Sequence, residues 1–200
     1  MQVSQAVGNA LARLGVERVF GVIGSGNFAV TNALHAAGGQ YIAARHECGA
    51  VCMADGYARV SGRVGVCSVH QGPGLTNTIT GLTEATKSRT PLLVLAADTP
   101  AAALRSNFRI DQDGLVESVG AIPERLHGPA SAVADAVRAY RRARVERRPV
   151  VLMMPLDVQA AEFTGEPGGA PGEVQLRRPK PPAETIAELA DLVVAAERPA

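Results

Sequence analysis

The chain has 200 residues, 46% of them hydrophobic, which suits one large domain with a buried core or one domain plus part of another. Its 20 basic and 19 acidic residues nearly cancel, which argues against a nucleic-acid-binding protein and against a polybasic membrane surface. No apolar run is long enough to span a membrane, and the N-terminal sequence lacks the pattern of a signal peptide. The sparse, odd set of three cysteines favours a reducing compartment, so we expect a cytoplasmic protein.

Helical and strand-like segments alternate along the chain. Apolar periodicity predicts helices at residues 4–15, 27–38, 46–60 and 131–144, and residues 72–88 are expected to form a glycine-rich turn that leads into a helix. Short apolar or β-branched runs predict strands at residues 17–24, 40–44, 63–69, 91–98 and 148–155. Residues 99–126 are expected to be irregular. This pattern predicts an α/β fold with an open, mostly parallel sheet and helices on both faces, whose ligands gather at the carboxyl ends of the strands.

The composition changes after Gln159. We expect a first domain at residues 1–159, a linker rich in glycine and proline at 160–182, and the start of a truncated second domain at 183–200. The last segment is an amphipathic helix, and the sequence ends before anything that it could pack on.

The cysteines and a cluster of arginines are interpreted as structural features rather than as binding sites. Three cysteines, Cys48, Cys52 and Cys67, are too few for a disulfide framework and lack further ligands at metal-binding spacing, so we expect buried small hydrophobic residues and no metal site. The six arginines between residues 138 and 148 are interpreted as a solvated helix face rather than a phosphate-binding surface.

Polar residues follow two of the predicted strands. Ser25 lies in a glycine-rich turn and could bind a ligand, whereas Asn27 is interpreted as the cap of the next helix. His70 and Gln71 lie where the strand at 63–69 ends, just before the turn Gly72-Pro73-Gly74. Free N–H groups at this helix start favour an anion or an electron-rich ligand, although a purely structural turn fits equally well.

Glu47 is an unexpected acid near the front of a stretch of small residues, "ARHECGAVCMADGY", at 44–57. Helix-end electrostatics is the simple explanation for a carboxylate in a first helical turn. Gly49, Ala50 and Ala54, however, leave room for another surface to approach closely. A glutamate held away from water against a neutral heterocycle can share a proton with a ring nitrogen.

Three motifs carry a resemblance to a known family. They are His46-Glu47-x-Gly49-Ala50, Asp55-Gly56-Tyr57-Ala58-Arg59 and Gly72-Pro73-Gly74-x-x-Asn77. With these motifs, residues 2–159 resemble the pyrimidine-binding domain of thiamine-diphosphate enzymes, and the acetolactate synthase family is the most similar group. The final segment resembles the entry into the central domain of that family, in agreement with a truncated chain.

The resemblance implies a role for each motif. Glu47 would hydrogen-bond N1′ of the aminopyrimidine of thiamine diphosphate and favour its imino tautomer, which activates the cofactor toward 2-oxo acids. Gly72, Pro73, Gly74 and Asn77 would complete the cofactor contacts.

The family places the diphosphate and its Mg²⁺ on a separate domain with a Gly-Asp-Gly motif, which this sequence lacks. We therefore expect a site shared with a second copy in a homodimer or tetramer, and a chain that is inactive by itself. A chain of a split enzyme is the less favoured alternative, because such a chain should end near Gln159. The resemblance leaves open FAD in the missing central domain and a role in branched-chain amino acid biosynthesis.

The substrate also stays open. The Gln112 segment, Asp111-Gln112-Asp113, is similar to an aromatic-Gln-acidic run of acetolactate synthases but lacks the aromatic residue, and Asp98 replaces a glutamine of that family. His70 matches a catalytic histidine of enzymes similar to benzoylformate decarboxylase, in which the counterpart of Ser25 binds the substrate carboxylate. We expect catalytic roles for Glu47, His70 and Gln112, and substrate contacts from Ser25, His70 and Gln71.

This sequence therefore predicts a carboligase or decarboxylase similar to acetolactate synthase. The alternatives are a decarboxylase similar to benzoylformate decarboxylase that uses His70 and Ser25, and a non-catalytic module that keeps the fold. Retention of Glu47 and the Gly-Pro-Gly turn counts against the last alternative.

Overall fold

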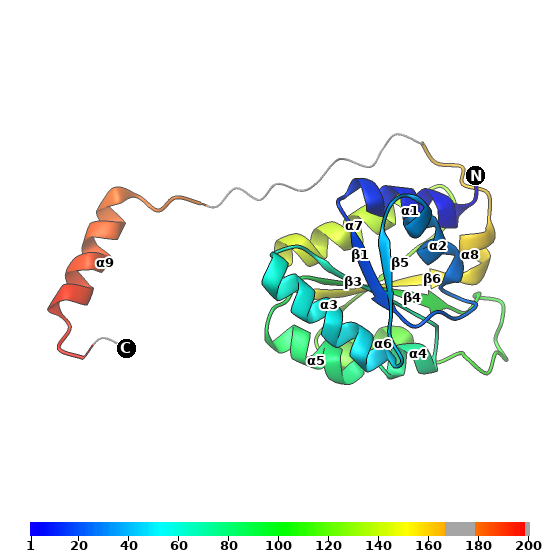
Figure 1. Ribbon diagram of the computed structural model, residues 1–200, viewed down its shortest axis with the longest axis horizontal. Helices are drawn as coiled ribbons and strands as arrows, with labels where there is room; N and C mark the ends of the chain where they lie inside the picture. Colours follow the sequence, from blue (N-terminus) through cyan, green and yellow to red (C-terminus); the bar gives the residue numbers. More distant parts are fainter. Residues whose placement is uncertain (167–178, 199–200) are drawn as a thin grey trace.

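A computed structural model describes residues 1–166 and 179–198 (Figure 1). Its first part is an α/β fold around one six-stranded sheet in the order β2-β1-β3-β4-β6-β5, and every pair of neighbouring strands is parallel. The strands are β1 (Arg18–Gly21), β2 (Gln40–Ala43), β3 (Gly65–Val69), β4 (Leu92–Asp98), β5 (Ile122–Arg125) and β6 (Pro149–Pro155). The predicted open parallel sheet is confirmed.

Helices cover both faces of the sheet (Figure 1). On one face lie α1 (Val3–Arg13), α2 (Phe28–Ala36), α7 (Ala132–Glu146) and the short α8 (Leu156–Ala160). On the other face lie α3 (Glu47–Ser61), α4 (Pro73–Thr76), α5 (Ile79–Lys87) and α6 (Gln112–Ser118). Alternate side chains of a strand point to opposite faces, so the fully buried runs of β3, β4 and β6 contribute to both cores.

The interpretation of residues 99–126 as irregular is wrong in its second half, where α6 and β5 form. The sequence of β5, Ile-Pro-Glu-Arg, contains a proline and two charges, so it does not read as a strand. It is tolerated because β5 is the edge strand and pairs only with β6. The turn expected at the start of residues 72–88 contains the short helix α4, which ends at Thr76, and the helix expected after it is α5, which begins at Ile79.

Helix α3 begins directly at Glu47. The Nδ1 atom of His46 accepts a hydrogen bond from the backbone N–H of Cys48 over 3.1 Å and so caps the helix in front of Glu47. The prediction that all three cysteines are buried is wrong, because Cys52 is exposed, Cys48 is half-buried and only Cys67 lies in the core. The residues that α3 buries are Ala50, Val51, Ala54 and Ala58, and neither Cys48 nor Cys52 is among them.

Two arginines of α7 form ion pairs, some of them with acids that are nearly buried. Arg138 contacts Glu124 and Asp135, while Arg142 contacts Glu124 and Glu146. None of the helices in the described ranges has both the length and the apolarity needed to cross a membrane.

The domain boundaries stay predictions. Part of the expected linker at 160–182 lies outside the described residues, which omit 167–178 and 199–200. Before that gap, Glu162 forms an antiparallel bridge with Gln2. After it, α9 (Ala183–Ala195) buries none of its residues and leaves its apolar side chains exposed, among them Ile186, Leu189 and Leu192.

Candidate active site

Ser25 and the segment from His70 to Gly74 follow β1 and β3, which are neighbours in the sheet, while Glu47 follows β2 at the start of α3 and Gln112 begins α6 after β4. From β1 the chain runs to β2 on one side, whereas from β3 it runs to β4 on the other. Such a reversal of strand order opens a crevice where α/β proteins bind ligands. Ser25 follows β1 and His70 follows β3, and the Ser25 Oγ and His70 Nε2 atoms lie 3.3 Å apart.

Glu47 lies beside the Gly-Pro-Gly turn. Its Oε2 accepts a hydrogen bond from the side-chain amide of Asn77 over 2.9 Å. Its Oε1 would lie 3.7 Å from a Cβ placed on Gly74, and no hydrogen-bond partner of Oε1 is found in the described ranges. The side chain is half-buried, so one oxygen is held in place and the other stays available to a ligand.

The hydrogen bonds of His70 define its tautomer. Nδ1 lies 3.1 Å from the backbone carbonyl of Gln71, which can only accept, so Nδ1 carries the proton of the neutral ring. Nε2 is then the acceptor for the hydroxyl of Ser25. The ring also packs edge-on against Phe108, with the two ring centroids 4.9 Å apart.

The Gly72 turn has no room for a side chain. Its φ of 61° favours glycine, and an added Cβ would come within 2.6 Å of the Phe108 carbonyl oxygen. The backbone N–H of Gly72 donates to Gln112 Oε1 over 2.8 Å, while Gln112 Nε2 donates to the carbonyl of Ala97 over 3.1 Å. Gln112 is buried, and both ends of its side chain thus join the turn to the end of β4.

Gln71 and Asn27 lie behind the site, in the interior. Gln71 is only 3% exposed, and among the described residues its Oε1 has no hydrogen-bond partner. The interpretation of Asn27 as a helix cap is only partly right, since Asn27 precedes α2 but its side chain makes no capping bond to that helix. It bonds instead to the loop before it and to Ser68.

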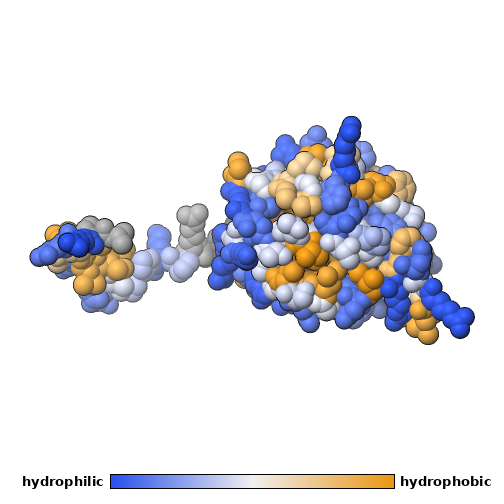
Figure 2. Space-filling model, turned by 90° about the horizontal axis from the view of Figure 1, so that it is seen from below, coloured by the Kyte–Doolittle hydropathy of each residue, from blue (hydrophilic) through white to orange (hydrophobic). Residues whose placement is uncertain are grey.

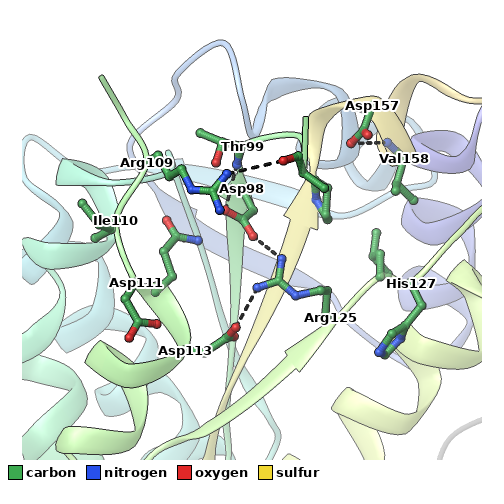
Figure 3. Close-up of a pocket in the computed structure, with 14 residues that line it drawn as sticks. Asp98, Thr99, Arg109, Ile110, Asp111, Asp113, Arg125, His127, Asp157 and Val158 are labelled. Carbon is green, nitrogen blue, oxygen red and sulfur yellow. Dashed lines mark hydrogen bonds and ion pairs between the residues drawn. The ribbon is translucent and has the colours of Figure 1, made fainter. Parts of the chain in front are cut away.

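A cavity of about 880 Å³ lies next to this site, at the carboxyl ends of β4, β5 and β6 (Figure 3). Arg125 forms ion pairs there with Asp98 and with Asp113. Burial acts to lower the pKa of Arg125, but the bonds and charges of the two aspartates outweigh it and raise this pKa. Across residues 1–166 and 179–198, no cluster of three or more His, Cys, Asp or Glu side chains could hold a metal ion.

Sequence reasoning missed two residues of this region. Phe108 places an aromatic ring on His70 although position 111, where the family pattern has an aromatic residue, is an aspartate. Arg125 neutralises Asp98, the residue noted as a departure from that pattern. An acid such as Asp98 at the end of a buried strand indicates that a basic partner is needed. No pattern in the neighbouring sequence identified Arg125 as that partner.

Comparisons with known proteins agree with the geometry. The family model described as "Thiamine pyrophosphate enzyme, N-terminal TPP binding domain" matches residues 1–118. The chain is 36% identical to the probable 2-ketoarginine decarboxylase AruI of Pseudomonas aeruginosa, over 98% of this chain and 36% of that protein. It is 37% identical to the acetolactate synthase large subunit of Lactococcus lactis, over 80% of this chain and 29% of that protein.

A solved structure shares the fold. The thiamine diphosphate-dependent 4-hydroxybenzoylformate decarboxylase of Rhodococcus jostii RHA1 matches with a TM-score of 0.86 at 22% identity, over 98% of this chain and 38% of that one. The chain spans about a third of the length of the curated relatives that it matches. From the family model and these relatives, the chain belongs to the thiamine pyrophosphate enzymes and contains their N-terminal TPP-binding domain.

Proposed function

We propose that this chain supplies the aminopyrimidine half of the cofactor site in an enzyme that decarboxylates 2-oxo acids or joins them to a second carbonyl compound. The observation that carries the proposal is the placement of Glu47. Asn77 holds one carboxylate oxygen, and the other stays available beside the Gly72-Pro73-Gly74 turn.

The surroundings of Glu47 fit a flat heterocycle. Gly74 has no side chain, and a Cβ placed there would lie 3.7 Å from Glu47 Oε1, so the turn sets no side chain against this oxygen. When bound, thiamine diphosphate supplies the electron sink that decarboxylation of a 2-oxo acid requires. Glu47 would hold the proton that it shares with the N1′ ring nitrogen, and Asn77 would keep the carboxylate turned toward that atom.

Tautomer control by a carboxylate requires that water be excluded. By itself this chain leaves Glu47 only half-buried. The face formed by α3 to α6 exposes apolar groups (Figure 2). On α3, Met53 is 37% exposed and Val60 is 92% exposed. We propose that a second copy covers the site in a dimer or tetramer and that its diphosphate-binding domain holds the Mg²⁺. FAD in a central domain stays a further proposal.

A decarboxylase of the benzoylformate type is favoured by the contact between Ser25 and His70. With Nδ1 bound to the Gln71 carbonyl, neutral His70 can take a proton only at Nε2, which faces Ser25. Once protonated, this N–H can be donated to a substrate carboxylate or returned to the reacting carbon. Ser25 is exposed and can orient the carboxylate of a 2-oxo acid, whereas a substrate contact of the Gln71 side chain stays a prediction.

An acetolactate synthase-type carboligase is supported by the relatives of that name. In that case Gln112 would be a positioning residue, because both ends of its side chain bind backbone groups. The similarity to a probable 2-ketoarginine decarboxylase extends the candidate substrates to 2-oxo acids with a basic side chain.

The test is Glu47→Gln in the complete enzyme, with the cofactor-binding domain present. We expect exchange of the cofactor C2 proton to slow by about 10²- to 10⁴-fold, the usual contribution of a positioned acid–base group, with the fold unchanged. Glu84→Gln is the matched control, because Glu84 is an exposed acid of α5 that hydrogen-bonds to Arg59 and Ser88, away from the proposed site. Exchange at the wild-type rate in Glu47→Gln would remove Glu47 from this role.

A further inference from the structure

The loop from Val22 to Asn27 presents Ser25, and its shape depends on a side chain that lies outside the site. Asn27 is completely buried. Its Oδ1 accepts a hydrogen bond from the backbone N–H of Gly24 over 2.9 Å, and its Nδ2 donates to the carbonyl of Val22 over 3.2 Å. The loop therefore closes around the Asn27 side chain, with Ser25 on its outer, exposed side.

Asn27 also connects this loop to the strand that carries His70. Its Nδ2 donates to Ser68 Oγ over 2.9 Å. The Thr31 hydroxyl donates to the Asn27 carbonyl over 2.7 Å, so the 2.6 Å contact between Ser68 and Thr31 has Ser68 as its donor. Every hydroxyl proton of this buried network has an acceptor, which fixes the loop on β3 two residues before His70.

The opposite side of the loop is held by Gln159, which lies far away in the sequence. Its Nε2 donates to the carbonyl of Gly26 over 3.0 Å and to that of Met154 over 2.7 Å. Gly26 packs so closely that an added Cβ would lie 2.0 Å from Gln71 Oε1 and 2.7 Å from Ala97 Cβ. The loop is thus clamped between the ends of β3, β4 and β6.

We propose that Asn27 and Gln159 are positioning residues, which set the distance between Ser25 Oγ and His70 Nε2 through the loop. Neither side chain approaches the open side of the site, since both are at least nine-tenths buried. An effect on kcat rests on the proposed function of Ser25 and His70. The effect on the distance between these two side chains does not depend on that function.

The test uses Gln159→Met, which keeps the length of the side chain in its buried place but removes both N–H donors. Ser68→Ala is the second variant, for the case that Gln159→Met does not fold. Thr86→Val is the control, because the Thr86 hydroxyl donates to the Leu82 carbonyl within α5. The first readout is the nuclear Overhauser contact between the Ser25 methylene and the His70 ring in the 200-residue chain. We expect this contact to be lost in both variants and kept in the control.

The second readout is a double-mutant cycle in the complete enzyme. Gln159→Met should lower kcat for a 2-oxo acid by about 10- to 100-fold with little change in KM, the range expected for a small misplacement of a reacting group. The same change in a Ser25→Ala background should have almost no further effect. An unchanged Overhauser contact in a folded variant would overturn the inference. A lost contact with unchanged kcat would support the positioning role and instead contradict the proposed use of Ser25 and His70.

Discussion

The side-chain amide of Asn77 donates to Glu47 Oε2 over 2.9 Å, which connects the break between α4 and α5 to the first residue of α3. Asn77 lies between the two helices with helical backbone dihedrals, and its side chain holds the carboxylate that the proposed chemistry needs.

Asn77→Ala should lower the rate of cofactor C2-proton exchange in the complete enzyme by about tenfold, which is less than for Glu47→Gln. The carboxylate would remain but would lose the bond that orients it. Thr76→Ala is the neighbouring control, since the Thr76 hydroxyl donates to the Pro73 carbonyl and not to Glu47. Equal exchange rates in Asn77→Ala and the wild type would show that the Glu47 orientation does not depend on this bond.

His70→Ala should lower the decarboxylation rate of the preferred 2-oxo acid by about 10²- to 10⁴-fold, because the site would lose the group that accepts and returns a proton. The variant is compared with the wild type on pyruvate, an aromatic 2-oxo acid and a 2-oxo acid with a guanidinium side chain. His35→Ala is the control, since His35 bonds to the Gly39 carbonyl at the end of α2. Unchanged decarboxylation rates on every substrate would show that His70 has only a structural role in the turn.

Gln112→Met should destabilise the chain by about 1–3 kcal/mol, because the N–H of Gly72 and the carbonyl of Ala97 would lose buried hydrogen bonds. Urea unfolding of the 200-residue chain measures this loss. Ser118→Ala, which removes an exposed bond to the Leu115 carbonyl, is the control on the same helix. A stability equal to that of the control would contradict the role of Gln112 as a clamp on the turn.

Asp135 should make stability depend on pH in the acid range. Its burial acts to raise its pKa, but the His127 backbone N–H, the Ser131 hydroxyl and Arg138 outweigh this effect and hold the pKa below the ordinary 3.8. The carboxylate therefore contributes its full stabilisation above about pH 3.8, and this contribution is lost as the pH falls through the lower native pKa.

Asp135→Asn tests this dependence. The variant should be less stable than the wild type by about 2 kcal/mol at neutral pH, because it loses charge-assisted bonds. The difference should narrow as the pH falls below about 3.8. Urea unfolding across this range gives the result, and a difference that stays constant with pH would show that the Asp135 charge is not what stabilises the fold.

The sequence by itself determined the features that depend on neighbours along the chain. The buried runs of β3, β4 and β6 were predicted because a covered parallel strand needs apolar residues on both faces. The start of α3 was found because His46 and Glu47 suit a helix end, and the motifs around Glu47, Gly72 and Asn77 identified the family.

Only the tertiary structure decided which distant groups meet. Phe108 reaches His70, Arg125 reaches Asp98 and Gln159 reaches Gly26 through the packing of separate strands, and no local pattern encodes these pairs. The edge strand β5 was missed for the same reason, since its proline and charges are acceptable only where one side of the strand has no neighbour. Local sequence sets the conformation of each segment, whereas partners far apart in the chain follow from how the segments pack.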